Sequence, residues 1–148
     1  MLARDIMSEP VVTTGPNASV EDAARIMVRH NFSCLPVVDE RKRLVGIVTH
    51  SDFVLHRRFL PLAEHLYSLL GSMVAPQGVE EAAHRLGTRL VKEVMSQPVV
   101  TIREEADFGE VAKVMVGRGV NRLPVMRGDQ LVGIITRHDL LKAMVSDS

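Results

Sequence analysis

IMSEPVVT, at residues 6–13, returns in this chain as VMSQPVVT at residues 94–101. Two further motifs are repeated in the same order: LPV at 35–37 and 123–125, and LVGIVTHSD at 44–52, which becomes LVGIITRHD at 131–139. The first two motifs share an offset of 88 residues (95 − 7 and 123 − 35), and the third has an offset of 87 (139 − 52). Such a duplication predicts two similar supersecondary units, each too small to bury a good core alone. We therefore expect function where the halves meet.

Composition predicts a globular protein. The chain has 148 residues, of which 46% are hydrophobic, which excludes the disordered and fibrous classes. Lys plus Arg and Asp plus Glu number 18 each, so there is no net basic field to attract nucleic acid or an anionic membrane. Aromatic residues make up 3% and Trp is absent, which leaves little for stacking on bases. Nucleic-acid binding through local Arg patches stays a weaker alternative.

The cellular compartment is indicated by the single cysteine and by the apolar segments. Cys34 has no partner for an internal disulfide, and its neighbours Phe32 and Leu35 suggest a small buried hydrophobe. The N-terminal MLARD lacks the apolar core of a signal peptide, and the most apolar stretch, 66–75, is too short to span a bilayer. We expect a cytoplasmic protein that has no membrane association.

The first helix of each repeat is predicted to be amphipathic. Ser19 with Asp22, and Asp107 with Glu110, place an N-cap oxygen three residues before an acid, which is capping-box chemistry. The helices are expected to end at Asn31 and Gly119. Apolar residues at i, i+3, i+4 and i+7 predict the buried faces, which are Val20, Ala23, Ala24 and Met27 in the first helix and Phe108, Val111, Ala112 and Met115 in the second.

A β-hairpin and a second helix follow in each repeat. The hairpin strands are expected at 34–38 and 44–49, and at 122–126 and 131–136. Pro36 and Pro124 donate no ladder hydrogen bond, so we expect them at the beginning of a strand or on its edge. The second helices are expected from Asp52 and Asp139. With leading extended segments at 11–13 and 99–101, each repeat is predicted as β-α-β-β-α.

These motifs resemble the cystathionine β-synthase (CBS) domain, which usually occurs as a tandem pair called a Bateman module. The resemblance rests on Met-Ser-x-x-Pro-Val-Val-Thr, Leu-Pro-Val and Leu-Val-Gly-Ile-Val-Thr-x-x-Asp, each present twice. It implies an α+β fold of two pseudo-twofold related repeats, with small mixed sheets flanked by helices. The expected divisions are repeat 1 at 1–56, a helical connector at 57–88 and repeat 2 at 89–148.

The candidate site lies where THSD (49–52) and TRHD (136–139) leave a strand and enter a helix. A helix N-terminus favours anions, and a carboxylate there can accept hydrogen bonds from the two hydroxyls of a ribose. Thr-x-x-Asp is also a capping box, which would start a helix without any ligand. Both interpretations stay open on spacing alone.

In CBS pairs the matching Asp commonly holds the ribose of an adenosine ligand, and the matching Thr or Ser assists with ribose or phosphate, in clefts between the two repeats. By this resemblance one cleft combines Thr49, Ser51 and Asp52 with Val99, Val100 and Asn121, and the other combines Thr136, His138 and Asp139 with Val11, Val12, Phe32 and Ser33.

Phosphate recognition differs between the two predicted clefts. Relatives often have His or Arg before Leu-Pro-Val, whereas this chain has Ser33-Cys34 and Asn121-Arg122. Only Arg122 offers a fixed charge and a planar fork for phosphate, and its alternative role is a solvated surface cation. The clefts are therefore expected to be unequal.

The connector is longer than a compact pair requires. Two apolar helical stripes are predicted in it, one formed by Leu62, Leu66, Leu69 and Leu70 and the other by Val79, Ala82, Ala83, Leu86 and Leu90. They would pack on their own module, or dock a second subunit or a client protein. Because family pairs often dimerise through helices bordering the repeats, we expect a homodimer.

No catalytic or metal site is predicted. The six histidines show no helical i, i+4 pair and no nearby cysteine pair. Ser51 lies between His50 and Asp52, but adjacent residues do not form a catalytic triad, and no Gly-x-Ser-x-Gly elbow occurs.

The sequence and its resemblance together predict a non-catalytic regulatory module that requires no cofactor. It would bind AMP, ADP, ATP or S-adenosylmethionine and would signal in trans to a client protein. The alternatives are a structural dimerisation or docking module without ligand, and weak nucleic-acid binding.

Overall fold

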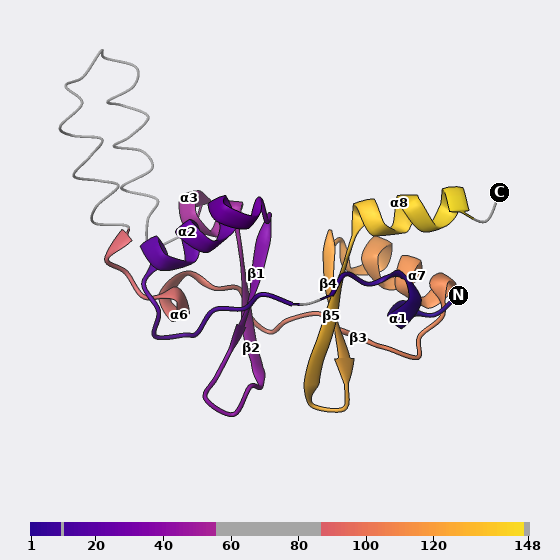
Figure 1. The fold of residues 1–148 in the computed structure, drawn as a ribbon, viewed down its shortest axis with the longest axis horizontal. Helices are drawn as coiled ribbons and strands as arrows, with labels where there is room; N and C mark the ends of the chain where they lie inside the picture. The colour runs from indigo at the N-terminus through magenta and orange to yellow at the C-terminus, as the bar shows by residue number, and fades with distance from the viewer. Residues whose placement is uncertain (10, 56–86, 147–148) are drawn as a thin grey trace, which may run out of the picture. The chain divides into compact units, whose positions relative to one another are not determined.

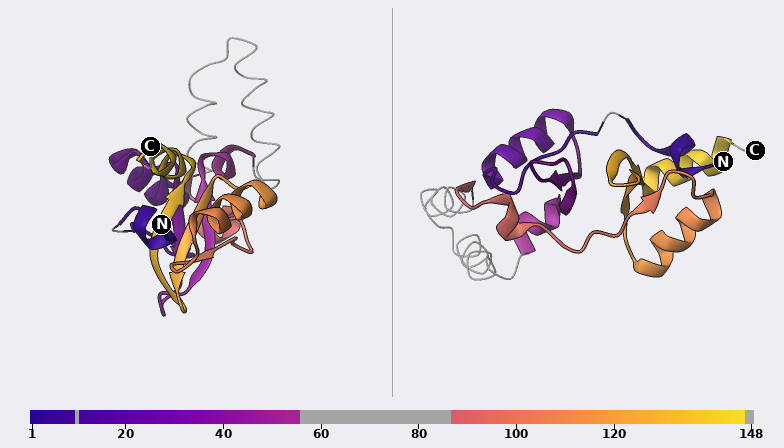
Figure 2. Two further views of the ribbon diagram at one scale, coloured as in Figure 1. Left: turned by 90° about the vertical axis from the view of Figure 1, so that its right-hand side faces the viewer. Right: turned by 90° about the horizontal axis from the view of Figure 1, so that it is seen from below.

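The computed structural model describes residues 1–9, 11–55 and 87–146, which fold into two compact units. The second-repeat unit comprises the described residues of Met1–Val12, Glu40–Leu44 and Pro98–Ser148. The first-repeat unit comprises Thr13–Asp39 and the described residues of Val45–Gln97. Each unit is a small sheet with helices on one of its faces (Figures 1 and 2), in agreement with the predicted α+β class.

The second-repeat unit is built on a three-stranded sheet of order β3-β4-β5. β3 pairs parallel with β4, and β4 pairs antiparallel with β5, as expected for the hairpin. The elements of this unit are α1 (Ala3–Ile6), β3 (Ile102–Arg103), α7 (Phe108–Arg118), β4 (Arg122–Arg127), β5 (Gln130–Thr136) and α8 (Arg137–Ser146).

The first-repeat unit has the same plan with a shorter sheet. β1 and β2 pair, and a single parallel bridge from Thr14 to Val37 takes the place of β3. The elements of this unit are α2 (Val20–His30), β1 (Cys34–Val38), β2 (Leu44–Thr49), α3 (His50–Leu55) and α6 (Val91–Val94). Cys34 is buried, as its apolar neighbours predicted.

The leading segments are exchanged between the repeats. Ser8 forms an antiparallel bridge with Ile134 on β5, although Ser8 belongs by sequence to the first repeat. Ser96 forms the equivalent bridge with Ile47 on β2. The short helices before these serines are tied in the same way, since the Ala3 N–H donates to the Ala106 carbonyl at 2.7 Å. Each compact unit therefore combines the hairpin of one repeat with the Met-Ser segment of the other.

A glycine in each hairpin makes room for the exchanged segment. A Cβ on Gly133 would lie 2.7 Å from Cγ of Met7 and closer still to its sulfur. A Cβ on Gly46 would lie 2.9 Å from Cγ of Met95, again with the sulfur closer. Because any side chain would displace the methionine, these glycines allow Met-Ser to approach the sheet.

Both amphipathic helices begin and end where the sequence predicts. The Asp22 N–H donates to the Ser19 hydroxyl at 3.0 Å. Asp107 and Glu110 form a reciprocal capping box with hydrogen bonds of 2.8 and 2.9 Å. The C-caps Asn31 and Gly119 have left-handed φ values of 55° and 63°.

The structure differs from the sequence prediction in where the leading strands and the second helices begin. The segments 11–13 and 99–101 are not strands, because pairing begins only at Thr14 and Ile102. The second helices begin at His50 and Arg137, two residues before the aspartates, because the aspartates lie inside the first turn that they stabilise.

Pro124 lies inside the middle strand, and not at a strand beginning or edge as predicted. Its partner on β5 is Ile134, whose backbone N–H and C=O both bond to Ser8 at 3.3 and 2.8 Å. Pro124 and Ile134 are therefore a non-hydrogen-bonded pair, in which the missing N–H of proline costs nothing.

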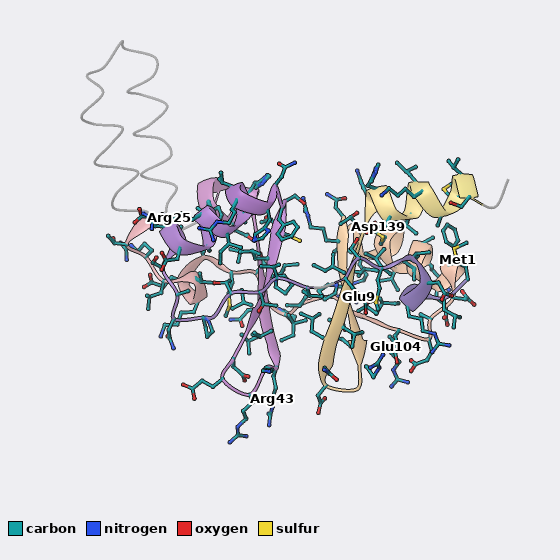
Figure 3. All side chains as sticks on the ribbon, in the orientation of Figure 1. Met1, Glu9, Arg25, Arg43, Glu104 and Asp139 are labelled. Atoms are coloured by element: carbon teal, nitrogen blue, oxygen red, sulfur yellow. The ribbon has the colours of Figure 1, made fainter. Side chains whose placement is uncertain are left out.

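Buried apolar residues join the sheet of the second-repeat unit to its helices. The fully enclosed group contains residues from α1, α7, β4 and β5, namely Ala3, Val111, Met115, Leu123, Val125 and Ile135. An ion pair lies at the edge of this unit and joins Arg127 to Glu104, which is labelled in Figure 3. Glu104 is only 6% exposed, whereas the side chain of Arg127 is 60% exposed. The Glu104 carboxylate accepts hydrogen bonds from Nε and Nη2 of Arg127 at 2.8 and 3.0 Å.

The connector prediction falls mainly on 57–86, which lies outside the described residues. Among the residues that the structure describes, no helix is long and apolar enough to cross a membrane.

Gly133→Ala should destabilise the protein, because the new methyl group displaces the Met7 side chain. We expect a loss of about 1–3 kcal/mol in the free energy of unfolding, measured by urea denaturation. Gly117→Ala is the matched control, since a Cβ there meets nothing within 4 Å and alanine favours the helix. In a Met7→Ala background the cost of Gly133→Ala should shrink; an unchanged cost would contradict the contact.

Glu104→Gln should destabilise the protein in a pH-dependent manner. Hydrogen bonding to Arg127 lowers the pKa of Glu104 below its ordinary value of 4.5. A lowered folded-state pKa stabilises the protein above the unfolded-state pKa, and this contribution disappears as the pH falls through the folded-state pKa. The stability difference from wild type, measured by urea unfolding, should therefore be largest near neutral pH and shrink below about pH 4.5.

Glu21→Gln provides the control for this titration. It removes an ion pair with Arg25 whose side chains are 55% and 67% exposed, so it should change stability by at most about 1 kcal/mol. A Glu104→Gln effect that stays constant from neutral to acidic pH would show that packing alone, and not ionisation of Glu104, accounts for it.

Candidate functional site

The end of β2 brings together Thr49 and Asp52, two residues of the predicted site. Oδ2 of Asp52 accepts hydrogen bonds from the Thr49 N–H at 2.8 Å and from the Thr49 hydroxyl at 3.2 Å. Oδ1 accepts a hydrogen bond of 2.9 Å from the hydroxyl of Ser96. One carboxylate oxygen thus accepts the hydrogen bonds that cap the helix, and the other accepts a hydrogen bond from the exchanged segment.

The end of β5 repeats this arrangement around Asp139, which is labelled in Figure 3. Oδ2 of Asp139 accepts hydrogen bonds from the Thr136 N–H at 2.8 Å and the Thr136 hydroxyl at 3.1 Å. The Ser8 hydroxyl lies 3.3 Å from Oδ1 and 3.5 Å from Oδ2, a longer contact than that of Ser96. Oδ1 of Asp139 is therefore held more loosely than Oδ1 of Asp52.

The helix-capping interpretation of Thr-x-x-Asp is realised in both places. The Asp139 N–H also donates to the Thr136 hydroxyl oxygen at 3.3 Å, which completes a reciprocal cap. A carboxylate has about four acceptor positions, so the cap does not exhaust it. The observed group can start a helix and still accept hydrogen bonds on its second oxygen.

Ser8 and Ser96 are site residues that the sequence prediction missed. Their motif is visible in the sequence as the repeated Met-Ser, but its contact with the aspartate depends on the exchange of segments. Both serines are exposed, and each presents a hydroxyl to an aspartate of the other repeat. Each serine hydroxyl donates to a carboxylate oxygen that could instead accept a hydrogen bond from a ribose hydroxyl.

Asn121 and Arg122 lie beside the Asp139 group. Arg122 is the cross-strand partner of Thr136, so the two side chains leave the hairpin on the same face. The Asn121 carbonyl accepts a hydrogen bond of 3.2 Å from the Arg137 N–H. The predicted approach of Asn121 to Asp52 stays a prediction.

Other predicted residues are distributed over both units. Phe32 belongs to the first-repeat unit, where its ring stacks on His30 at 5.1 Å and its carbonyl lies 3.3 Å from Nε2 of His50. Ser33 is in the same unit and half-buried. The side chain of Ser51 is not described, and His138 is exposed.

Val11 and Val12 are half-buried in the unit that contains Asp139. The predicted combinations across the two units stay predictions.

Val99 and Val100 line a pocket of about 550 Å³ in the second-repeat unit. One wall is the extended segment 98–101, and the other is formed by α7 residues that the sequence prediction missed: Lys113, Val114, Gly117 and Arg118. Among the described residues, no three His, Cys, Asp or Glu side chains lie close enough to hold a metal ion.

Sequence comparison identifies relatives of the whole described region. The family model of the CBS domain matches residues 3–58 and 91–146. An uncharacterized protein of Methanocaldococcus jannaschii is 31% identical, with 98% of this chain and 92% of that protein covered. Other curated relatives are longer: an inosine-5′-monophosphate dehydrogenase of the same archaeon is 30% identical over 95% of this chain, which spans 23% of its length.

Comparison with solved structures agrees with the match to the CBS domain family. The CBS domain of a CBS domain containing membrane protein from Sphaerobacter thermophilus is 38% identical, with 96% of this chain and 86% of that chain covered and a TM-score of 0.77. The CBS domain pair of protein MJ0100, in complex with 5′-methylthioadenosine and S-adenosyl-L-methionine, is 27% identical, with 100% and 98% covered and a TM-score of 0.72. These matches confirm the predicted two-repeat organisation.

Proposed function

Because the chain belongs to the CBS domain family, as a tandem pair of CBS repeats, we propose that it is a regulatory module that senses an adenosine-containing ligand. The observation that carries the proposal is the pair of half-buried aspartates, each with one oxygen used by its helix start and the other facing a serine hydroxyl.

A ribose suits these aspartates chemically. Its two adjacent hydroxyls donate to one carboxylate, and a hydroxyl of the sugar replaces the serine hydroxyl with a hydrogen bond of the same kind. The replacement should be easier at Asp139, where the Ser8 hydroxyl is 3.3 Å from Oδ1, than at Asp52, where the Ser96 distance is 2.9 Å. The predicted Thr136 and Arg122 lie next to Asp139 and would assist in binding ribose and phosphate.

The solved CBS pair that contains 5′-methylthioadenosine and S-adenosyl-L-methionine supports an adenosyl ligand for this chain. AMP, ADP, ATP and S-adenosylmethionine are the candidates.

Signalling would follow from the exchanged segments. Ser8 and Ser96 connect each aspartate to a Met-Ser segment that belongs by sequence to the other repeat. A ligand that takes the place of the serine changes how firmly this segment is held, and only such a difference in affinity between two conformations can transmit a signal. We propose that a homodimer presents the signal in trans to a client protein, without catalysis by this module.

A structural docking module is the competing function. It is favoured by the hydrogen bonds from Thr49 to Asp52 and from Thr136 to Asp139, which cap helices without any ligand. The two functions differ in whether an adenosine compound stabilises the fold.

Wild-type protein should be stabilised by at least one of AMP, ADP, ATP and S-adenosylmethionine. A ligand at about 100 times its Kd adds about 2.7 kcal/mol to the free energy of unfolding. In a chain of this size that corresponds to roughly 2–4 °C in Tm per kcal/mol, which thermal shift detects readily. If none of the four raises Tm, the sensor function is wrong and the docking module remains.

Asp139→Asn and Asp52→Asn should each remove one binding event measured by calorimetry. Asparagine keeps an oxygen for the helix cap but offers a single acceptor where a ribose diol needs two. Asp129→Asn, in the exposed β4–β5 turn, is the control and should bind as wild type does. Unchanged binding by both site variants would overturn the assignment of the aspartates.

A further inference from the structure

The pocket beside α7 has the size and lining of a small-molecule site. Its volume of about 550 Å³ lies within the usual range for ligand pockets, roughly 300–1,000 Å³. Pro98, Val99, Val100 and Val114 give it apolar walls. Val100 and Val114 also pack against the buried core of the unit, so these walls are held in place.

Two cations border the pocket. Lys113 and Arg118 lie on the pocket side of α7, and the lining includes no carboxylate. In the part of the chain that the structure describes, neither side chain forms an ion pair or a hydrogen bond. Both charges are therefore available to an anion.

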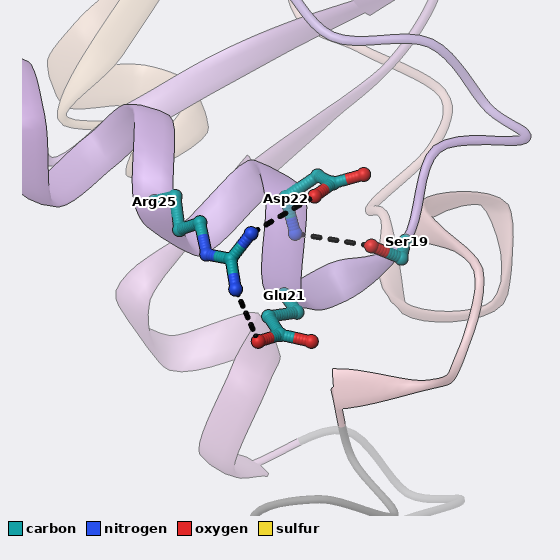
Figure 4. A network of polar contacts seen from close by, with 4 residues as sticks. All are labelled: Ser19, Glu21, Asp22 and Arg25. Atoms are coloured by element: carbon teal, nitrogen blue, oxygen red, sulfur yellow. Dashed lines mark hydrogen bonds and ion pairs between the residues drawn. The ribbon is translucent and has the colours of Figure 1, made fainter.

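The corresponding helix of the first repeat has its cation neutralised. Arg25, the counterpart of Lys113 at the 88-residue offset, pairs with Glu21 at 2.8 Å and approaches Asp22 at 3.8 Å (Figure 4). On α7 the position of Glu21 is taken by Gly109.

The counterpart of Asp22 does not neutralise Lys113 either. Glu110 stands at this position of α7, and its carboxylate accepts the hydrogen bond of the Asp107 N–H in the capping box. The substitutions between the repeats thus leave α7 without a partner for its cations.

The space beside the helix also differs between the two repeats, and it is again the second repeat that is more open to a ligand. Gly117 lines the pocket, and a Cβ at this position would meet nothing within 4 Å. The first repeat has Arg29 at the equivalent position. The second repeat therefore combines an open wall with two uncompensated charges.

We infer that this pocket accepts the phosphate of a nucleotide, with Lys113 and Arg118 as its phosphate-binding residues. The apolar walls suit the base or the sugar face, and the cations suit a phosphate and repel the positively charged sulfonium of S-adenosylmethionine. The inference rests on the proposed function, because Val99 and Val100 are also residues expected to contact the adenosine ligand. It names that ligand as a phosphorylated adenosine.

The double variant Lys113→Gln/Arg118→Gln tests this assignment by calorimetry with AMP and with adenosine. Wild type should bind AMP more tightly than adenosine, and the preference should fall as salt is added. The double variant should lose about tenfold or more in AMP affinity, as expected for lost hydrogen bonds to a charged group, while its affinity for adenosine stays unchanged.

The matched control is Arg25→Gln/Arg29→Gln, which removes two positive charges from the corresponding helix α2 and should leave the AMP preference intact. A second variant, Gly117→Leu, fills the pocket with a good helix former, so it should remain folded by circular dichroism and lose the AMP binding event at this pocket.

The outcomes separate the two proposals. If the double variant keeps the wild-type preference for AMP over adenosine, the phosphate is bound elsewhere; the inference is then wrong and the sensor function stands. If Gly117→Leu binds AMP normally, the pocket is likewise excluded. If wild type binds neither AMP nor adenosine, both the proposed function and this inference fail.

Discussion

The contact between a methionine and a bare glycine is the interaction on which each compact unit depends. Met7 lies against Gly133 and Met95 against Gly46, and in each case a side chain on the glycine would displace the methionine. The close approach lets the following serine pair with the hairpin as one more backbone partner. That pairing in turn brings the serine hydroxyl to the aspartate at the end of the same strand, so the fold and the candidate site share one packing constraint.

Duplication preserved this framework while the charges around it changed. The ion pair of Glu104 and Arg127 has no equivalent in the first repeat, where Pro16 and Asp39 stand at the corresponding positions. The helix α2 pairs Arg25 with Glu21, whereas α7 leaves Lys113 without such a partner. The second repeat therefore has both the ion pair at its sheet edge and the exposed cations beside a pocket.

Most of the local structure followed from the sequence, because caps, stripes and hairpins are set by residues close together in the chain. The helix α2 has its predicted caps at Ser19 and Asn31, and α7 has its predicted caps at Asp107 and Gly119. The exchange of segments was not predictable, since Met7 fits Gly46 and Gly133 equally well as sequence motifs. For the same reason the contacts of Ser8 and Ser96 were missed. The place of Pro124 inside the middle strand was not predicted either, because it depends on Ser8 taking the hydrogen bonds of Ile134. The pocket depends on α7 surface residues that carry no pattern of their own.

The exchange itself is tested most directly by nuclear Overhauser effects between methionine methyl protons and glycine α protons. The structure predicts contacts from Met7 to Gly133 and from Met95 to Gly46. The account would be contradicted by contacts from Met7 to Gly46 and from Met95 to Gly133 in place of these two. Such contacts would show that each segment packs on its own repeat.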